Sequence, residues 1–138
     1  RRRLKIKRIL GNPQKGGSRG WTIWNKDGTV VYESGATFET ALAEAGFWPD
    51  KRAGKKGVEP ESVTVGTFDG TRYIFVGAER ADAVGVYDAT DLSNPILKQI
   101  LPSGIAPEGL KAIPSRNLFV TSNEKDKKVR GNLTIFQF

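Results

Sequence analysis

Hydrophobic residues in the middle of the chain occur in short runs, each of which ends at turn residues. Three such runs, at residues 63–65, 73–76 and 84–87, are rich in β-branched and aromatic side chains. These side-chain types suit a pleated, half-buried strand. Asp69 and Gly70 lie between the first two runs, and this dipeptide favours the positive φ angles of a tight hairpin turn. The pattern therefore predicts an antiparallel meander of three strands.

The same pattern returns later in the sequence, which indicates an internal repeat. The matching segments are 60–63 with 107–110, 74–79 with 118–124 (with one extra residue), and 84–87 with 133–136. An apolar run at residues 96–101 predicts a fourth strand for the first copy. A period in the forties with about four strands per period is typical of β-propeller blades. A chance match, or a common hairpin of a β-sandwich, is the alternative explanation.

The first third of the chain contains a second hairpin signal and one helical signal. Apolar residues at 21–24 and 29–32 flank an Asn-Lys-Asp-Gly turn, and we expect the aromatic side chains there to lie in a core. Residues 37–46 break the strand pattern, because their apolar residues recur at helical spacing. We expect Thr37 to be the N-cap of this helix and Gly46 to be its stop signal.

These elements predict an all-β fold. We expect a β-propeller fragment of two to three blades of antiparallel four-stranded sheet, with one short helix near residues 37–46. Alternating residues at 4–10 predict a further strand. The expected divisions are an incomplete blade with the Trp21 hairpin at 1–35, the helix and a basic loop at 36–57, a full blade at 58–104, and a last blade lacking its outer strand at 105–138.

The composition excludes several classes of active site. The 138 residues include no Cys, no His and no Met. Thiol nucleophiles, Cys/His zinc sites and Ser-His-Asp triads are therefore excluded, and oxygen ligands would favour calcium or magnesium. No apolar run approaches the roughly 20 residues of a membrane-spanning helix, so we predict no transmembrane segment.

The net charge of +7 comes mainly from three basic clusters. Such clusters attract polyanions, for example anionic glycans, lipid headgroups or nucleic acid. We do not expect nucleic acid, because no binding motif or aromatic stacking platform accompanies the charge. Solvated loops are the simpler explanation of the clusters. The candidate polyanion-binding residues are Arg1, Arg2, Arg3, Lys51, Arg52, Lys55, Lys56, Lys127 and Lys128.

Acidic residues occupy equivalent positions in the two repeats. Glu61 and Glu108 precede the first strand of each repeat, and Glu79 and Glu124 follow the second strand. Equivalent loops of a propeller gather at one end near its axis, so these four carboxylates are candidate ligands for calcium. The alternative is a structural role in which hydrogen bonds, or pairing with Arg80, fix the turns. Repetition favours that role, since a catalytic site is normally unique. The full acidic set is Glu59, Glu61, Glu79, Glu108 and Glu124.

Several motifs, in their order and spacing, resemble the choice-of-anchor I domain family. They are GWTIWNKDG (20–28), VVYESG (30–35), EPESVTVG (59–66), FVGAER (75–80), VYDATD (86–91), APEGL (106–110) and TSNE (121–124). The resemblance implies the C-terminal part of an extracytoplasmic β-propeller related to LVIVD-type and WD-like repeats. Members are several times longer, so we expect this chain to be a fragment or to lack segments. The family's calcium-loop-like insertion before the Trp21 hairpin is replaced by residues 11–19, which argues against a calcium site of that type.

Three functions remain open from the sequence. The first is a non-catalytic extracytoplasmic or cell-surface module for binding or structural assembly. The alternative is a metal-dependent phosphoesterase, because calcium-dependent phytases and some phosphatases are propellers with acidic axial sites. The third is a polyanion-binding surface protein with an anionic surface ligand. Exposed sheet faces and edges promote association, so the expected partner is the remainder of a larger propeller chain or further copies of this one.

Overall fold

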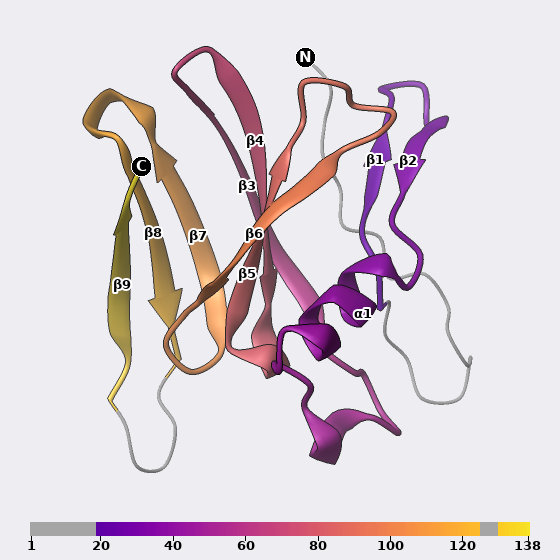
Figure 1. Ribbon diagram of the computed structural model, residues 1–138, viewed down its shortest axis with the longest axis vertical. Coiled ribbons are helices and arrows are strands. Elements are labelled where there is room, and N and C mark those ends of the chain that lie inside the picture. Colours follow the sequence, from indigo (N-terminus) through magenta and orange to yellow (C-terminus); the bar gives the residue numbers. More distant parts are fainter. Residues whose placement is uncertain (1–18, 125–129) are drawn as a thin grey trace.

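The computed structural model describes residues 19–124 and 130–138, which form three antiparallel sheets and one short helix (Figure 1). The first sheet pairs β1 (Thr22–Trp24) with β2 (Val30–Glu33). The second has the order β3 (Pro60–Phe68), β4 (Thr71–Ala78), β5 (Ala83–Asp88) and β6 (Ile96–Pro102). The third has the order β7 (Pro107–Ile113), β8 (Leu118–Asn123) and β9 (Asn132–Gln137). Helix α1 spans Thr37–Glu44, and 3-10 turns occupy Asp50–Arg52, Glu79–Ala81 and Pro114–Arg116.

The three sheets fan out side by side, as successive blades of a β-propeller do (Figure 1). The predicted fold class, an all-β propeller fragment with one short helix, is confirmed. Local turn chemistry explains the hairpins: Asp69 and Gly70 both have positive φ, at 47° and 79°, as the tight turn between β3 and β4 requires. The strand predicted at residues 4–10 lies outside the described residues.

The second sheet is covered on both faces, because side chains alternate across each strand. One face carries Ile74 and Val76, which pack with Trp21 of the first sheet and with Phe38 and Leu42 of α1. Trp21 is only 1% exposed, so the expectation that it belongs to a core is confirmed.

The other face of the second sheet packs on the third. It carries Phe75, Val84 and Val86, which form a second core with Phe119 of β8. The rings of Phe75 and Phe119 stack with their centroids 4.2 Å apart. The stacked pair fixes how the two sheets sit against each other.

Helix α1 begins one residue earlier than the sequence suggests. Ala36, and not Thr37, is its N-cap, and no side chain caps it. The Thr37 hydroxyl instead donates to the carbonyl of Ser34 at 2.7 Å. The predicted stop at Gly46 is confirmed: this residue has φ of 85°, and the helix ends before it.

The repeat is present in the backbone, but its register differs from the predicted alignment. A bulge follows the first residue of β3 and of β7, so that Ser62 pairs with Gly77 as Gly109 pairs with Ser122. Residues 73–79 therefore match residues 118–124 one for one. The sequence alignment was wrong to assume one extra residue in the second copy. The sequence alignment had matched Phe75 of β4 with Phe119 of β8, because the residues around both are similarly apolar. The two phenylalanines are one position apart and point to opposite faces of their own sheets, which is why they meet between the sheets.

Candidate functional site

The candidate site lies at the end of the molecule where β3 and β7 begin. These two strands lie against each other, and the Ser62 hydroxyl donates to the Pro107 carbonyl at 3.3 Å. Each strand begins with a proline that follows a residue at φ of 53°, Glu59 in one sheet and Ala106 in the other. β4 and β8 end at this same edge. Glutamates at the ends of four strands therefore lie close together.

Matching backbone hydrogen bonds hold the two repeats in the same local conformation. The amide of Glu79 donates to the Glu59 carbonyl at 3.0 Å, and the amide of Glu124 donates to the Ala106 carbonyl at 3.0 Å. The carbonyl acceptor sits one residue before the proline in both cases. The predicted equivalence of Glu79 with Glu124, and of Glu61 with Glu108, is therefore confirmed.

All four predicted metal-ligand candidates come together, in two overlapping groups that share Glu79. One oxygen from each of Glu79, Glu108 and Glu124 lies within 4.8 Å of the other two. Glu59, Glu61 and Glu79 form a second group by the same measure. Glu79 is buried, with its side chain 2% exposed, whereas Glu61 and the two glutamates of the third sheet are exposed.

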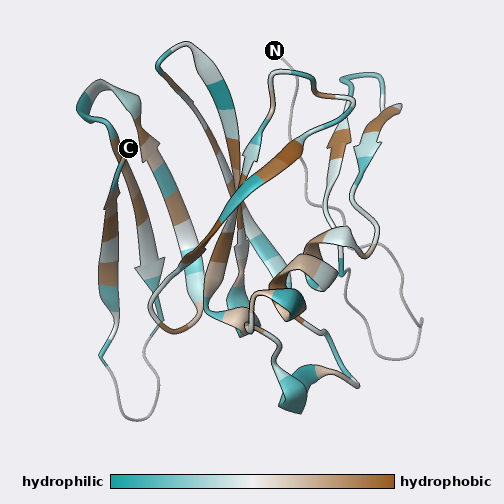
Figure 2. Ribbon diagram, viewed as in Figure 1, coloured by the Kyte–Doolittle hydropathy of each residue, from teal (hydrophilic) through white to brown (hydrophobic). Residues whose placement is uncertain are grey.

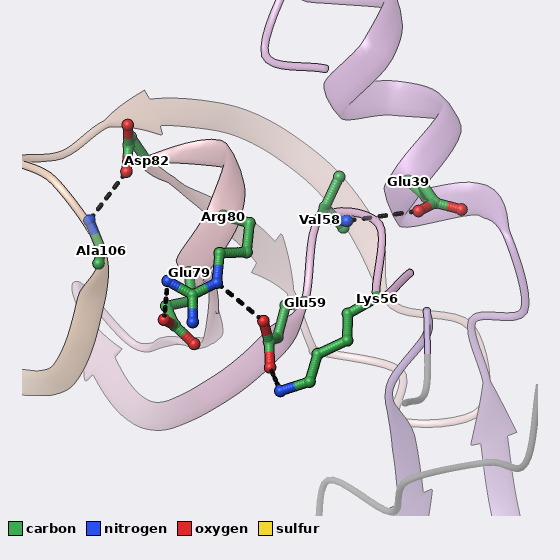
Figure 3. A network of polar contacts seen from close by, with 8 residues as sticks. All are labelled: Glu39, Lys56, Val58, Glu59, Glu79, Arg80, Asp82 and Ala106. Atoms are coloured by element: carbon green, nitrogen blue, oxygen red, sulfur yellow. Dashed lines mark hydrogen bonds and ion pairs between the residues drawn. The ribbon is translucent and has the colours of Figure 1, made fainter. Parts of the chain in front are cut away.

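Arg80 is the cation at the centre of this cluster (Figure 3). Its Nε donates to Glu59 Oε2 at 3.0 Å, and its terminal nitrogen lies 2.6 Å from Glu79 Oε1. Lys56 forms an ion pair with the other oxygen of Glu59. The 3-10 turn Glu79–Ala81 positions Arg80 directly after the buried carboxyl group that it contacts.

Crowding of carboxyl groups changes their proton affinity. Burial raises the pKa of Glu79 to about 8, and the hydrogen bond with the Glu61 side chain and the charges of Glu59 and Glu61 act in the same direction, while Arg80 opposes them. The pKa of Glu108 is also raised, first by the charge of Glu124, then by burial and by a hydrogen bond with the Glu124 side chain. Each repeat thus holds two glutamates whose carboxyl groups lie close together.

The family model of the choice-of-anchor I domain matches residues 4–92. The chain belongs to the choice-of-anchor I domain family. A search of the curated proteins and a search of the solved structures each found no match.

The family suggests that this choice-of-anchor I chain is a surface-associated module. The matched residues include the first sheet, α1 and strands β3 to β5 but end before β6 and the third sheet. Within the described residues, no helix is both long and apolar enough to span a membrane.

The cluster of this choice-of-anchor I chain fits a calcium ion only in part. Calcium takes six to eight oxygen ligands, and each group brings together three carboxylates. Glu79, the member common to both groups, is already paired with Arg80 at 2.6 Å and hydrogen-bonded to Glu61. A cation would therefore have to displace a guanidinium group that is held by two carboxylates. Asp88 and Asp91 accept hydrogen bonds from the amides of Thr90 and Ser93, as turn-forming aspartates do.

The predicted basic residues of the central loop lie together, but they differ in what they contact. Lys51 and Lys55 are exposed, and Arg52 is half-buried. Lys56 is engaged by Glu59, a partner that no local sequence signal indicates because it depends on how the loop folds back. The other candidates, Arg1, Arg2, Arg3, Lys127 and Lys128, lie outside the described residues.

Asp82 is a residue of this region that sequence reasoning missed. It adopts φ of 51° after the 3-10 turn of Arg80, and its Oδ1 accepts a hydrogen bond from the Ala106 amide at 2.8 Å (Figure 3). The bond joins the second sheet to the residue before β7. An aspartate before a strand resembles any turn former, so the sequence offers no signal for this contact.

Proposed function

We propose that this choice-of-anchor I chain is a non-catalytic, extracytoplasmic module for binding or assembly, in which the glutamate–arginine cluster holds the strand ends of a sheet together. One observation carries the proposal: the same backbone hydrogen bond and the same converging glutamates occur in both repeats, with Glu79 close to Glu61 in one and Glu124 close to Glu108 in the other. A reaction needs one set of groups with separate roles, whereas a fastening element is needed in every sheet.

The contacts of the cluster support this role. Arg80 joins the end of β4 to Glu59, which precedes β3, and its partners Glu59 and Glu79 are both buried. A buried carboxylate such as Glu59 is costly unless it is paired and hydrogen-bonded, so removing its cation leaves a larger penalty than the ion pair gains. Arg80 is therefore expected to stabilise the edge where the strands of the second sheet begin and end.

The test is to measure catalysis and stability on the same samples. We expect no hydrolysis of p-nitrophenyl phosphate with or without calcium, and a lower melting temperature for Arg80→Met. Glu44→Gln, a change at an exposed glutamate of α1, is the matched control and should melt like the unmodified protein. Calcium-dependent turnover that EDTA abolishes would overturn the proposal, as would an Arg80→Met protein as stable as the control.

A metal-dependent phosphoesterase is the second candidate, and the convergence of Glu79, Glu108 and Glu124 within 4.8 Å favours it. This function requires calcium to bind and compete with Arg80. Calorimetric titration of calcium measures that binding directly, with Glu108→Gln as the variant and Glu44→Gln as the control. Saturable calcium binding that Glu108→Gln weakens at least tenfold, together with turnover, would establish the enzyme; no heat of binding would exclude it.

Polyanion binding is a third candidate, favoured by the adjacent exposed side chains of Lys51 and Lys55. Binding through such a loop depends on counterion release and weakens steeply with added salt. Retention on immobilised heparin in a salt gradient tests it, with Lys51→Gln/Lys55→Gln as the variant and Lys98→Gln on β6 as the control. Equal elution of all three proteins would exclude the loop as the binding surface.

A further inference from the structure

The face of the third sheet that is turned toward the second sheet carries a group of polar side chains. Side chains alternate across each strand, so the strand pairing identifies the residues that share this face with Phe119 and Phe136. Figure 2 shows nearly neutral and strongly hydrophobic residues alternating along β9. We call the polar residues next to these two phenylalanines the Asn–Thr cluster; they are Thr121, Asn123, Asn132 and Thr134.

Hydrogen bonds join the members of the Asn–Thr cluster across β8 and β9. Asn123 Nδ2 donates to Asn132 Oδ1 at 2.8 Å and to Thr134 Oγ1 at 3.0 Å. Asn123 Oδ1 accepts a hydrogen bond from the Thr121 hydroxyl at 3.0 Å. Thr121 and Asn123 are both buried. These bonds satisfy polar groups that would otherwise be costly to bury between two sheets.

The cluster also contacts the segment that connects the second sheet to the third. The amide of Gly104, between β6 and β7, donates to Thr134 Oγ1 at 3.2 Å. A Cβ at Gly104 would lie 2.6 Å from Asn123 Nδ2 and 2.7 Å from Asn132 Oδ1. The cluster therefore fits a backbone that has no side chain at this point, and that backbone is the one that leaves the second sheet.

The equivalent positions of the second sheet carry smaller and less polar residues. Strand pairing gives these equivalents, which in the order of the cluster are Val76, Ala78, Ala83 and Gly85. The first three are fully buried in the core that the second sheet forms with the first sheet and α1. Both sheets thus bury the same positions against the sheet that precedes them, but with residues of different size and polarity.

Size prevents the third sheet from packing where the second sheet packs. A Cβ at Gly85 would lie 2.6 Å from Cε2 of Phe38 in α1, which is closer than side chains approach each other. Thr134 would place a branched side chain at that point, and an asparagine would replace an alanine at two further positions of a filled core. In the opposite exchange, small apolar residues would leave the Gly104 amide without its acceptor.

We infer that the Asn–Thr cluster determines which neighbour the third sheet binds: it accepts the second sheet with its connecting segment and rejects the surface formed by the first sheet and α1. Sheets built from one repeat have similar backbones, and repeat proteins misassemble when such units exchange places. Buried polar groups and residue size can select one arrangement even where they add no stability. This inference goes beyond the proposed function and holds whether or not the protein is an enzyme.

Refolding of a doubly labelled chain tests the inference. The sequence has no cysteine, so Thr67→Cys and Lys111→Cys place fluorescent labels at exposed positions of β3 and β7, two strands that lie against each other. The test variant gives the cluster its second-sheet residues: Thr121→Val, Asn123→Ala, Asn132→Ala and Thr134→Gly. After dilution from urea, single-molecule energy transfer should show one folded population for the unmodified cluster. In the variant we expect a second population with lower transfer, at least about tenfold more abundant than in the unmodified chain.

Two single substitutions separate recognition from stability. Thr134→Val keeps the branched shape that Phe38 excludes but cannot accept the hydrogen bond of Gly104, so it should unfold at lower urea and still refold to one population. Thr134→Gly removes that shape and should show the second population, and it serves as the test if the fourfold variant does not fold. A single folded population in both the fourfold variant and Thr134→Gly would overturn the inference. A second population as large in Thr134→Val as in Thr134→Gly would also overturn it.

Discussion

The raised pKa of Glu79 predicts that the protein becomes less stable as the pH rises from 5 to 8. In the folded state this carboxyl group holds its proton up to about pH 8, because it is buried and hydrogen-bonded to Glu61, whereas its ordinary value is 4.5. A group that binds its proton more tightly when folded contributes stability that is fully present below pH 4.5 and is lost as the pH rises through 8. Replacing Glu79 by Gln removes this dependence, because an amide does not titrate.

The magnitude follows from linkage between proton binding and folding. Each pH unit over which only the folded state holds the proton contributes about 1.4 kcal/mol. Between pH 4.5 and pH 7 this gives roughly 3 kcal/mol for Glu79. That loss is a large fraction of the roughly 5–15 kcal/mol by which typical domains are stable.

Urea unfolding followed by circular dichroism at pH 5, 6, 7 and 8 measures the effect. We expect the free energy of unfolding to fall across this range in the unmodified protein and in Glu44→Gln, and to fall much less in Glu79→Gln. Part of the slope remains in Glu79→Gln, because the pKa of Glu108 is also raised. A flat or rising profile for the unmodified protein, or the same slope in Glu79→Gln, would refute the raised pKa of Glu79.

Three substitutions test the packing on which the site depends, each by urea unfolding at pH 6. Gly57→Ala should cost at least about 2 kcal/mol, because Gly57 has φ of 61° and a Cβ there would overlap the Glu39 carboxylate; near-neutral behaviour would contradict this backbone geometry. Phe119→Ala should cost about 3–5 kcal/mol by emptying the second core, and a loss under 1 kcal/mol would mean that the two sheets do not pack as described. Asp82→Ala should cost about 1–3 kcal/mol by leaving the Ala106 amide without its acceptor, and no change would mean that the bond does not join the sheets.

The features that sequence analysis predicted are those encoded over a few residues. Asp69-Gly70 turns the chain because its backbone preferences act locally, and Gly46 ends α1 for the same reason. The equivalence of Glu61 with Glu108 was also accessible, since each directly follows a proline. Sequence analysis placed both glutamates before a strand, whereas each is the second residue of its strand, β3 or β7.

The features that it missed depend on contacts between distant residues. The one-residue offset of Phe75 and Phe119 follows from bulges at the starts of β3 and β7, and no apolar pattern reports a bulge there. The ion pair of Lys56 with Glu59 and the bond from the Ala106 amide to Asp82 arise only once the loop and the two sheets are in place. Charge and turn propensity identify such residues as polar but do not select their partners.

Charge compensation in the second sheet strengthens the structural interpretation of its glutamates. Carboxyl groups that converge repel one another when they are ionised, and a cation held between them limits this cost. Arg80 is such a cation, because its guanidinium group contacts both Glu59 and Glu79. Within the described residues, the buried Glu79 is the carboxyl group that Arg80 approaches most closely. In the sequence of the next repeat, Lys125 follows Glu124 as Arg80 follows Glu79.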